Sequence, residues 1–162
     1  MDYSDELCAT VTERRDSLRR ISDDAAAMRP SPDAWSAKEI IGHLIDSASN
    51  NHQRFVRARW QDDLIFPGYE QDGWVAAQRY NDRDWLELVD FWALFNRHLA
   101  HVMDSVPDEV RLRPHTRHNL HERAWTVVPA GQPTTLDYFM RDYVGHLRHH
   151  LRQLDALNLP VR

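Results

Sequence analysis

The chain of 162 residues is 42% hydrophobic and 28% charged, and its formal net charge is −5. These values fit a single globular domain over residues 1–162 and leave no concentrated basic surface, which argues against a nucleic-acid-binding protein. One cysteine excludes an intrachain disulfide framework. The chain has no run of about 18 apolar residues and no basic-then-apolar leader, so we expect a cytoplasmic protein that does not contact a membrane.

The first half of the chain predicts two long helices and one short helix. Apolar residues recur at helical spacing from Ser4 to Ala27, and prolines then end the pattern. A second helix is expected from Ser36 to about Trp60, because Ser36 and Glu39 have the spacing of a capping box. After a Pro-Gly break, a short helix is expected from Gln71 to Gln78.

The second half predicts two more long helices with a long connection between them. A regular stripe of aromatic and aliphatic residues runs from Asp84 to Val106, as in the seam of a helical bundle. Residues 107–133 are polar and proline-rich, and we interpret them as a connection with a short hairpin at 125–128. Thr134 and Asp137 then predict the cap of the last helix. Four long amphipathic helices predict an all-α four-helix bundle.

The ten histidines include one pair at helical spacing. His146 and His150 lie on the last predicted helix, where positions four apart share a face and can converge on one metal ion. The pair alone is a weak signal, because any histidine-rich helix contains such pairs. His43, near the apolar side of the second helix, is the candidate third ligand; the alternative is a hydrogen-bonded core histidine.

The neighbours of His43 favour the ligand interpretation. Ser47, Asn50 and Arg54 follow it at spacings of four, three and four, so they form a polar stripe along one helix face. Such a stripe either faces solvent or lines a pocket inside the bundle, where helical bundles commonly build metal and ligand sites. We therefore expect these three residues to contact a substrate beside the metal.

The same tripeptide, Gly-His-Leu, occurs in two of the predicted helices. Gly42 precedes His43, and Gly145 precedes His146. A glycine inside a helix costs about 1 kcal/mol relative to alanine. The two glycines indicate either close approach of two helices or crowding beside the site; the alternative is that the repeat is a coincidence.

Several stretches of the sequence resemble the DinB-like superfamily. Residues 35–44 (WSAKEIIGHL) are similar to the start of its second helix, and residues 145–154 (GHLRHHLRQL) to its last helix. The resemblance extends over most of the chain, from 35 to 157. The run HLIDS at 43–47 is similar to the YfiT-like branch, and five further residues share this similarity: Asn50, Arg54, Phe55, Tyr69 and Trp74.

The resemblance implies a bundle of up-down-down-up connectivity with a divalent metal, zinc or nickel, on His43, His146 and His150. It also implies a homodimer and a small-molecule substrate. Members are metal-dependent hydrolases or S-transferases that use the thiols bacillithiol or mycothiol. The branch tends to carry another histidine soon after the last pair, where this chain has Gln153.

Three functions remain open for such a site. In thiol S-transfer, the leading candidate, the metal lowers the pKa of a bound thiol, so that the thiolate is the nucleophile. Arg54 would then anchor a carboxylate of the thiol or of the substrate. Hydrolysis uses metal-activated water with Glu39 or Asp46 as the base, although Glu39 also fits the capping box and Asp46 a ligand-orienting or solvated role. The third is metal binding without catalysis.

The long connection holds a second group of histidines. His115, His118 and His121 are spaced three apart. We expect them to lie at the surface or in a lid and not to bind the metal.

Overall fold

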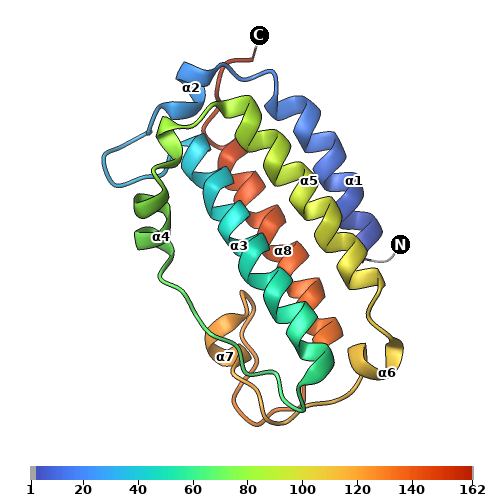
Figure 1. Ribbon diagram of the computed structural model, residues 1–162. Coiled ribbons are helices and arrows are strands. Elements are labelled where there is room, and N and C mark those ends of the chain that lie inside the picture. Colours follow the sequence, from blue (N-terminus) through green and yellow to red (C-terminus); the bar gives the residue numbers. More distant parts are fainter. Residues whose placement is uncertain (1–2, 162) are drawn as a thin grey trace.

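Four long helices pack side by side in the computed structural model, which describes residues 3–161. In Figure 1, α1 and α8 run toward one end of the bundle and α3 and α5 run the opposite way, so the connectivity is up-down-down-up. Helix α5 packs against α1 and α3, and α8 packs against the same two helices. The predicted all-α bundle is confirmed. The four helices are α1 (Tyr3–Leu18), α3 (Ala37–Arg57), α5 (Trp85–Asp104) and α8 (Leu136–Asp155).

Side-chain caps fix where three of these helices begin. Ser36 accepts a hydrogen bond from the Glu39 amide, and the Glu39 carboxylate accepts from the Ser36 amide, so the predicted capping box is present before α3. Asp84 caps α5 by accepting from the amide of Glu87. Helix α8 is capped by Thr135 and not by the expected Thr134, whose amide instead pairs with the carbonyl of His115 in the long connection.

Apolar stripes on the four helices meet in one core. Its bulkiest fully buried members come from α3, α5 and α8, and they anchor the helices that carry the candidate ligands. These bulky residues are Phe55, Trp85, Trp92 and Phe139.

No helix in the described part of the chain is both long and apolar enough to cross a membrane.

The first predicted helix is wrong in its extent. It breaks after Leu18, and a separate helix, α2 (Asp23–Ala27), follows. Ser22 has extended backbone angles and accepts a hydrogen bond from the amide of Ala25, so it begins a new helix. The indole nitrogen of Trp85 donates to the carbonyl of Leu18 at 2.9 Å, which satisfies one carbonyl at the end of α1.

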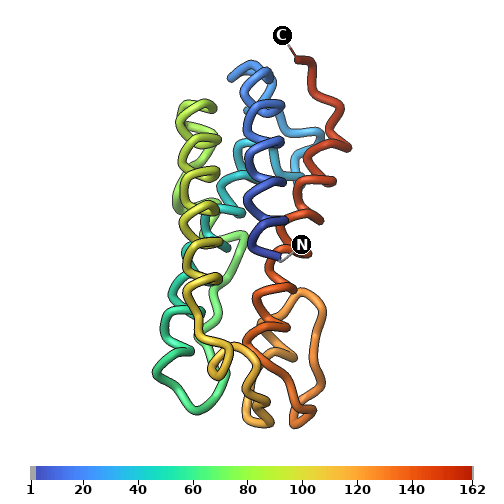
Figure 2. The backbone as a smooth tube through the Cα atoms, turned by 90° about the vertical axis from the view of Figure 1, so that its right-hand side faces the viewer, coloured from blue at the N-terminus to red at the C-terminus, as the bar shows by residue number. Residues whose placement is uncertain are grey.

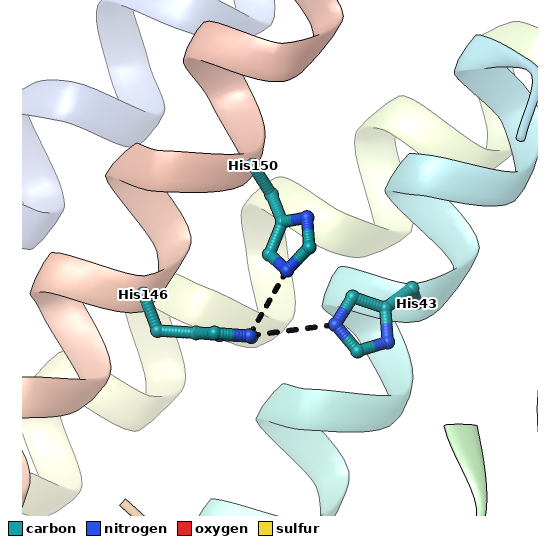
Figure 3. Close-up of side chains that lie close together, drawn as sticks. All are labelled: His43, His146 and His150. Carbon is teal, nitrogen blue, oxygen red and sulfur yellow. Dashed lines mark hydrogen bonds between the residues drawn. The ribbon is translucent and has the colours of Figure 1, made fainter. Parts of the chain in front are cut away.

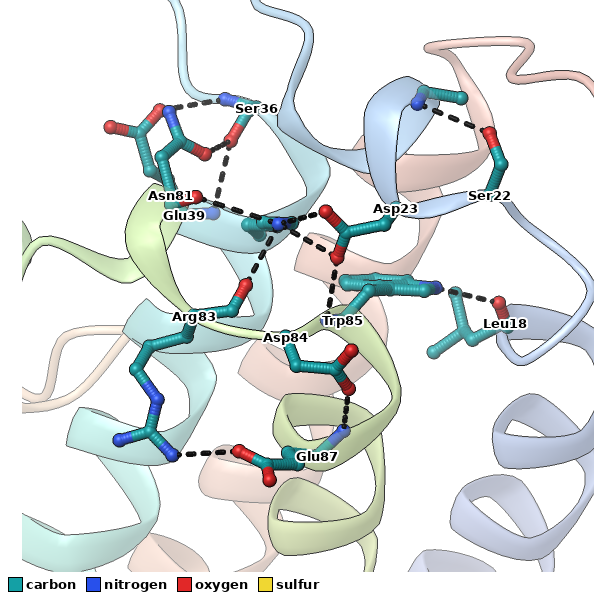
Figure 4. A network of polar contacts seen from close by, with 12 residues as sticks. Leu18, Ser22, Asp23, Ser36, Glu39, Asn81, Arg83, Asp84, Trp85 and Glu87 are labelled. Carbon is teal, nitrogen blue, oxygen red and sulfur yellow. Dashed lines mark hydrogen bonds and ion pairs between the residues drawn. The ribbon is translucent and has the colours of Figure 1, made fainter.

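A buried lysine ties this break to the start of α5. The ammonium group of Lys38 donates to the Asp23 carboxylate at 2.8 Å and to the carbonyl of Arg83 at 2.8 Å. Asp23 also accepts from the amide of Trp85 at 2.8 Å (Figure 4). The Lys38 side chain is almost fully buried, so these bonds replace its hydration.

The connection that follows α3 (residues 58–70) and the connection between α5 and α8 (residues 105–135) lie at the end of the bundle where α8 begins, as Figure 2 shows. They pair with each other through Leu64, whose amide donates to Arg117 and whose carbonyl accepts from Asn119. The first connection leads to α4, which has the bounds expected from the sequence. The short elements are the 3-10 turns η1 (Ala58–Trp60) and η2 (Tyr80–Asp82) and the helices α4 (Gln71–Gln78), α6 (Asp108–Arg111) and α7 (Leu120–Arg123).

The predicted hairpin at 125–128 does not form. Within residues 3–161 the only β-pairing consists of isolated bridges, and none involves this segment. The amides of Trp125 and Thr126 instead each donate to the Asp142 carboxylate on α8 at 2.8 Å. A side chain on the helix therefore takes the place of a partner strand.

Candidate metal centre

Three histidines from two antiparallel helices point their Nε2 atoms toward one another (Figure 3). His43 comes from α3, and His146 and His150 come from successive turns of α8. The Nε2 atom of His146 lies 3.0 Å from that of His150 and 3.5 Å from that of His43. One ring nitrogen of each residue lies within 4.8 Å of the other two.

These separations suit a shared metal ion. Two nitrogens bound about 2.1 Å from a tetrahedral ion lie about 3.4 Å apart, close to the two measured distances. Imidazole nitrogens are suitable ligands for zinc and nickel alike. Within residues 3–161 no carboxylate or thiol joins the three nitrogens. The donor set therefore fits a divalent ion that keeps an open coordination position, as catalytic zinc does.

A hydrogen bond to its outer nitrogen sets the tautomer of His150, whereas the outer nitrogens of the other two ligands have weaker contacts or none. The Nδ1 atom of His150 donates to the side-chain oxygen of Gln153 at 2.9 Å, so the lone pair of its Nε2 faces the cluster. The Nδ1 atom of His146 lies 3.5 Å from the hydroxyl of Ser47. The Nδ1 atom of His43 is buried without a hydrogen-bond partner among the described residues.

The environment keeps the three imidazoles neutral. Burial, followed by the neighbouring His150, lowers the pKa of His43 to about 3. Burial and the neighbouring histidines also lower the pKa of His146 to about 3. Burial lowers the pKa of His150, while its hydrogen bond to Gln153 acts in the opposite direction. Neutral imidazole is the form that binds metals, so each ring is ready as a ligand near pH 7.

Aromatic rings pack against the helices beside the ligands. A Cβ atom on Gly42 would lie 2.1 Å from the Tyr80 ring, and one on Gly145 would lie 3.1 Å from the Trp125 ring. The crowding expected beside the site is therefore present at both glycines, and it comes from rings outside the four long helices and not from close approach of two helices. Trp35, just before α3, covers the cluster on another side, with its ring centroid 5.0 Å from that of His43.

The cluster opens into a cavity of about 370 Å³ between α3, α8 and the two connections. Its wall combines polar and aromatic side chains from four segments of the chain. This composition is suited to a small polar ligand with an aromatic or apolar part. Besides His146 and His150, the wall includes Ser47, Asn51, Arg54, Tyr69, Arg123, Trp125, Phe139 and Asp142.

The polar stripe of α3 faces inward for most of its length. Ser47 and Arg54 are buried and line the cavity. Asn50 does not line it; this residue is half-buried, and its amide group donates to the carbonyl of Asp46. Asn51, four residues after Ser47, occupies the wall instead. The i+4 spacing from His43 through Ser47 to Asn51 is the signal that identifies it.

The two candidate general bases have other partners. The Glu39 carboxylate accepts from the Ser36 amide and pairs with Arg29. The Asp46 carboxylate accepts from Gln78 at 2.6 Å and from the Tyr80 hydroxyl at 2.7 Å. Neither carboxylate lines the cavity.

The histidines of the long connection are mostly structural. His115 and His118 are buried, against the expectation of surface or lid positions. Nδ1 of His115 donates to the carbonyl of Asp62, and Nε2 of His118 donates to that of Gln132. These bonds tie the connection together, which spacing alone could not reveal. His121 is exposed, as expected.

The bundle and its three convergent histidines define a class of helical proteins with a candidate metal site beside an open cavity. A model of the DinB superfamily matches residues 9–154, so the chain belongs to the DinB superfamily, as the sequence motifs predicted. Among solved structures, YfiT from Bacillus subtilis matches with a TM-score of 0.77 and 15% identity, over 96% of this chain and 83% of that one. YfiT is described as a probable metal-dependent hydrolase with an unusual four-helix bundle topology. No curated protein sequence matches the chain.

Proposed function

We propose that this DinB-superfamily protein is a metal-dependent enzyme that joins a low-molecular-weight thiol, bacillithiol or mycothiol, to an electrophilic substrate. His43, His146 and His150 would hold one divalent ion, zinc or nickel. The observation that carries the proposal is the convergence of three neutral imidazoles, two of which, His146 and His150, line a cavity large enough for a small molecule. When bound, the ion would lower the pKa of a thiol or of water at its open position.

The surroundings of the three histidines favour a thiol over water as the nucleophile. Hydrolysis calls for a general base within hydrogen-bond reach of the water. Of the two carboxylates expected to serve, Glu39 pairs with Arg29, and Asp46 accepts from Tyr80 and Gln78 through Oδ1. Neither of them lines the cavity in which the water would react. A thiol needs no such base, because its pKa of about 8.5 is already close to neutrality and falls further beside a cation.

In the proposed reaction the thiolate sulfur forms a bond to the electrophilic carbon. The leaving group, a halide for example, departs with the electron pair of the broken bond, and the thiol proton passes to solvent. Ser47 and Arg54 would contact the bound molecules from α3, while Trp35 packs against His43 and Trp125 forms part of the cavity wall. Asn50 has no place in this proposal, because it does not line the cavity.

Hydrolysis is the second candidate, because the similar structure of YfiT is described as that of a probable metal-dependent hydrolase. Among the acidic residues on the cavity wall, Asp142 accepts from two backbone amides, but Glu122 is exposed and pairs only with neighbouring side chains. Glu122 is thus the carboxylate on the wall with most freedom to act as a base for this second reaction.

The test is an assay of zinc- or nickel-loaded protein with bacillithiol or mycothiol and a chlorinated nitroarene, following thioether formation. We expect turnover by the wild type, loss of turnover in His146→Ala, and wild-type turnover in His101→Ala, which removes an exposed histidine of α5. Turnover of esters or amides without any thiol, and no turnover with thiol, would replace this proposal with hydrolysis.

The homodimer and the cytoplasmic location stay predictions. Size-exclusion chromatography tests the first, and cell fractionation tests the second.

A further inference from the structure

A buried arginine on the cavity wall has no acidic partner. Arg54 is 6% exposed, and its guanidinium lies 5.9 Å from the centre of the Phe139 ring. It donates to the carbonyl of Pro67 at 3.0 Å and to the side-chain oxygen of Asn51 at 3.3 Å. Among residues 3–161 its Nε atom has no hydrogen-bond partner and the side chain forms no ion pair. Buried charges are normally paired. Arg54 departs from this rule, because no carboxylate of the described residues acts as its counter-ion.

A second arginine stands on the same wall. Arg123, at the end of α7, lies against the backbone of Gly68, where an added Cβ atom would be 2.2 Å from its guanidinium. Its Nε atom is also buried without a partner among the described residues. Burial lowers the pKa of Arg54, Tyr69 opposes this shift, and the charge of Arg123 adds a smaller lowering. Both arginines line the same cavity, so their like charges face one ligand space.

Among the described residues, neither acidic side chain of the cavity wall pairs with Arg54. Asp142 is occupied by the amides of Trp125 and Thr126. Glu122 pairs with Arg123 at 2.9 Å, but its side chain is 54% exposed, so water screens that contact. Arg54 therefore has no direct carboxylate partner on the wall, and its guanidinium can serve a ligand oxyanion.

We infer that Arg54 and Arg123 form a subsite for an oxyanion, a carboxylate or phosphate, carried by the thiol or its partner substrate. Guanidinium groups bind both kinds of oxyanion through paired hydrogen bonds. Phe139, beneath Arg54, precedes His146 by seven residues on α8, which is about 10 Å along the helix axis. The ligand would thus be elongated, with its acidic group about that far from its reacting atom. This inference rests on the proposed function, because it treats the cavity as the substrate site.

The test is calorimetric titration of the full chain at low ionic strength with two probes, sodium phosphate and sodium succinate. Arg54→Gln removes the buried charge. Gly68→Ala leaves every charge in place but pushes the flexible end of Arg123 out of its position. Arg117→Gln is the matched control, because this arginine belongs to the same connection, is 80% exposed and does not line the cavity.

We expect the wild type and Arg117→Gln to bind at least one probe equally well, at about one ion per chain. Arg54→Gln should weaken binding about tenfold or more, the loss expected for a charge-assisted hydrogen bond, and Gly68→Ala should weaken it severalfold. Tighter binding of phosphate would assign a phosphorylated ligand, and tighter binding of succinate a carboxylated one. Absence of binding in the wild type, or unchanged binding in both cavity variants, would overturn the inference.

Two further measurements keep the result interpretable. Circular dichroism shows whether Arg54→Gln folds, and if it does not, Gly68→Ala decides alone. Titration of His146→Ala separates this inference from the proposed function, because probe binding at the arginines should persist when the three-histidine site is broken. Loss of binding in that variant would mean that the probe binds a metal ion and not the arginines.

Discussion

The Nε2 atoms of His43 and His146 lie 3.5 Å apart although 103 positions separate the two residues in the chain. Two antiparallel helices, each anchored in the core by bulky side chains, bring them together. No backbone pairing links the two residues directly. The site is therefore a property of the helix packing, and it depends on the groups that orient each ring.

Gln153 is the group that orients His150. Replacing it with leucine removes the acceptor of the Nδ1 hydrogen bond, so the ring loses its fixed tautomer and orientation. We expect Gln153→Leu to weaken metal binding about tenfold or more, the usual effect of losing such a partner. Gln153→Glu keeps an acceptor and should bind at least as tightly as the wild type. Competition with a chromogenic chelator measures both, and equal affinity in the leucine variant would refute the role of Gln153.

The two glycines that precede ligands should differ in their tolerance of a methyl group. Gly42→Ala would place Cβ 2.1 Å from the ring of Tyr80, which is buried and hydrogen-bonded to Asp46, so we expect a loss of about 1–3 kcal/mol in unfolding free energy. At Gly145 the nearest ring atom, on the half-exposed Trp125, is 3.1 Å away and can shift. The helix-propensity gain of about 1 kcal/mol should then offset most of the strain.

Urea denaturation of the two glycine variants provides the comparison. Equal unfolding free energies for Gly42→Ala and Gly145→Ala would show that the two rings do not constrain the helices differently.

The buried ammonium group of Lys38 should matter for stability more than its surface neighbours. Lys38→Met keeps the length of the side chain but leaves the Arg83 carbonyl without this donor and the Asp23 carboxylate with only the amide of Trp85. We expect a loss of about 1–3 kcal/mol, because Asp23 is half-exposed and water replaces part of the interaction. Arg83→Ala removes only an exposed side chain and should change stability by less than about 0.5 kcal/mol. Similar denaturation midpoints for Lys38→Met and the wild type would contradict this assignment.

The helices were predictable where their periodicity and caps agreed. The capping box of Ser36 and Glu39 and the apolar stripe of α5 each have a local cause, and the structure contains both. The break after Leu18 was missed, because it depends on long-range contacts of Trp85 and Asp23. Local sequence reports propensity, whereas such contacts become visible only when the fold brings distant groups together.

The same distinction holds for the site. The i, i+4 spacing of His146 and His150, the polar stripe and the family resemblance identified the three histidines that the structure brings together. Arg123 and Trp125 could not be found in this way, because they reach the cavity from a connection with no periodic pattern. Gln153 was noted as a departure from the family pattern, but its contact with His150 required coordinates.

Elemental analysis of the purified protein beside two histidine variants tests the central claim most directly. His43→Ala removes one proposed ligand, and His52→Ala removes a histidine of the same helix that lies outside the cluster. We predict about one divalent ion per chain in the wild type and in His52→Ala, and almost none in His43→Ala after identical purification. Equal metal content in the wild type and His43→Ala would contradict a metal site built from His43, His146 and His150.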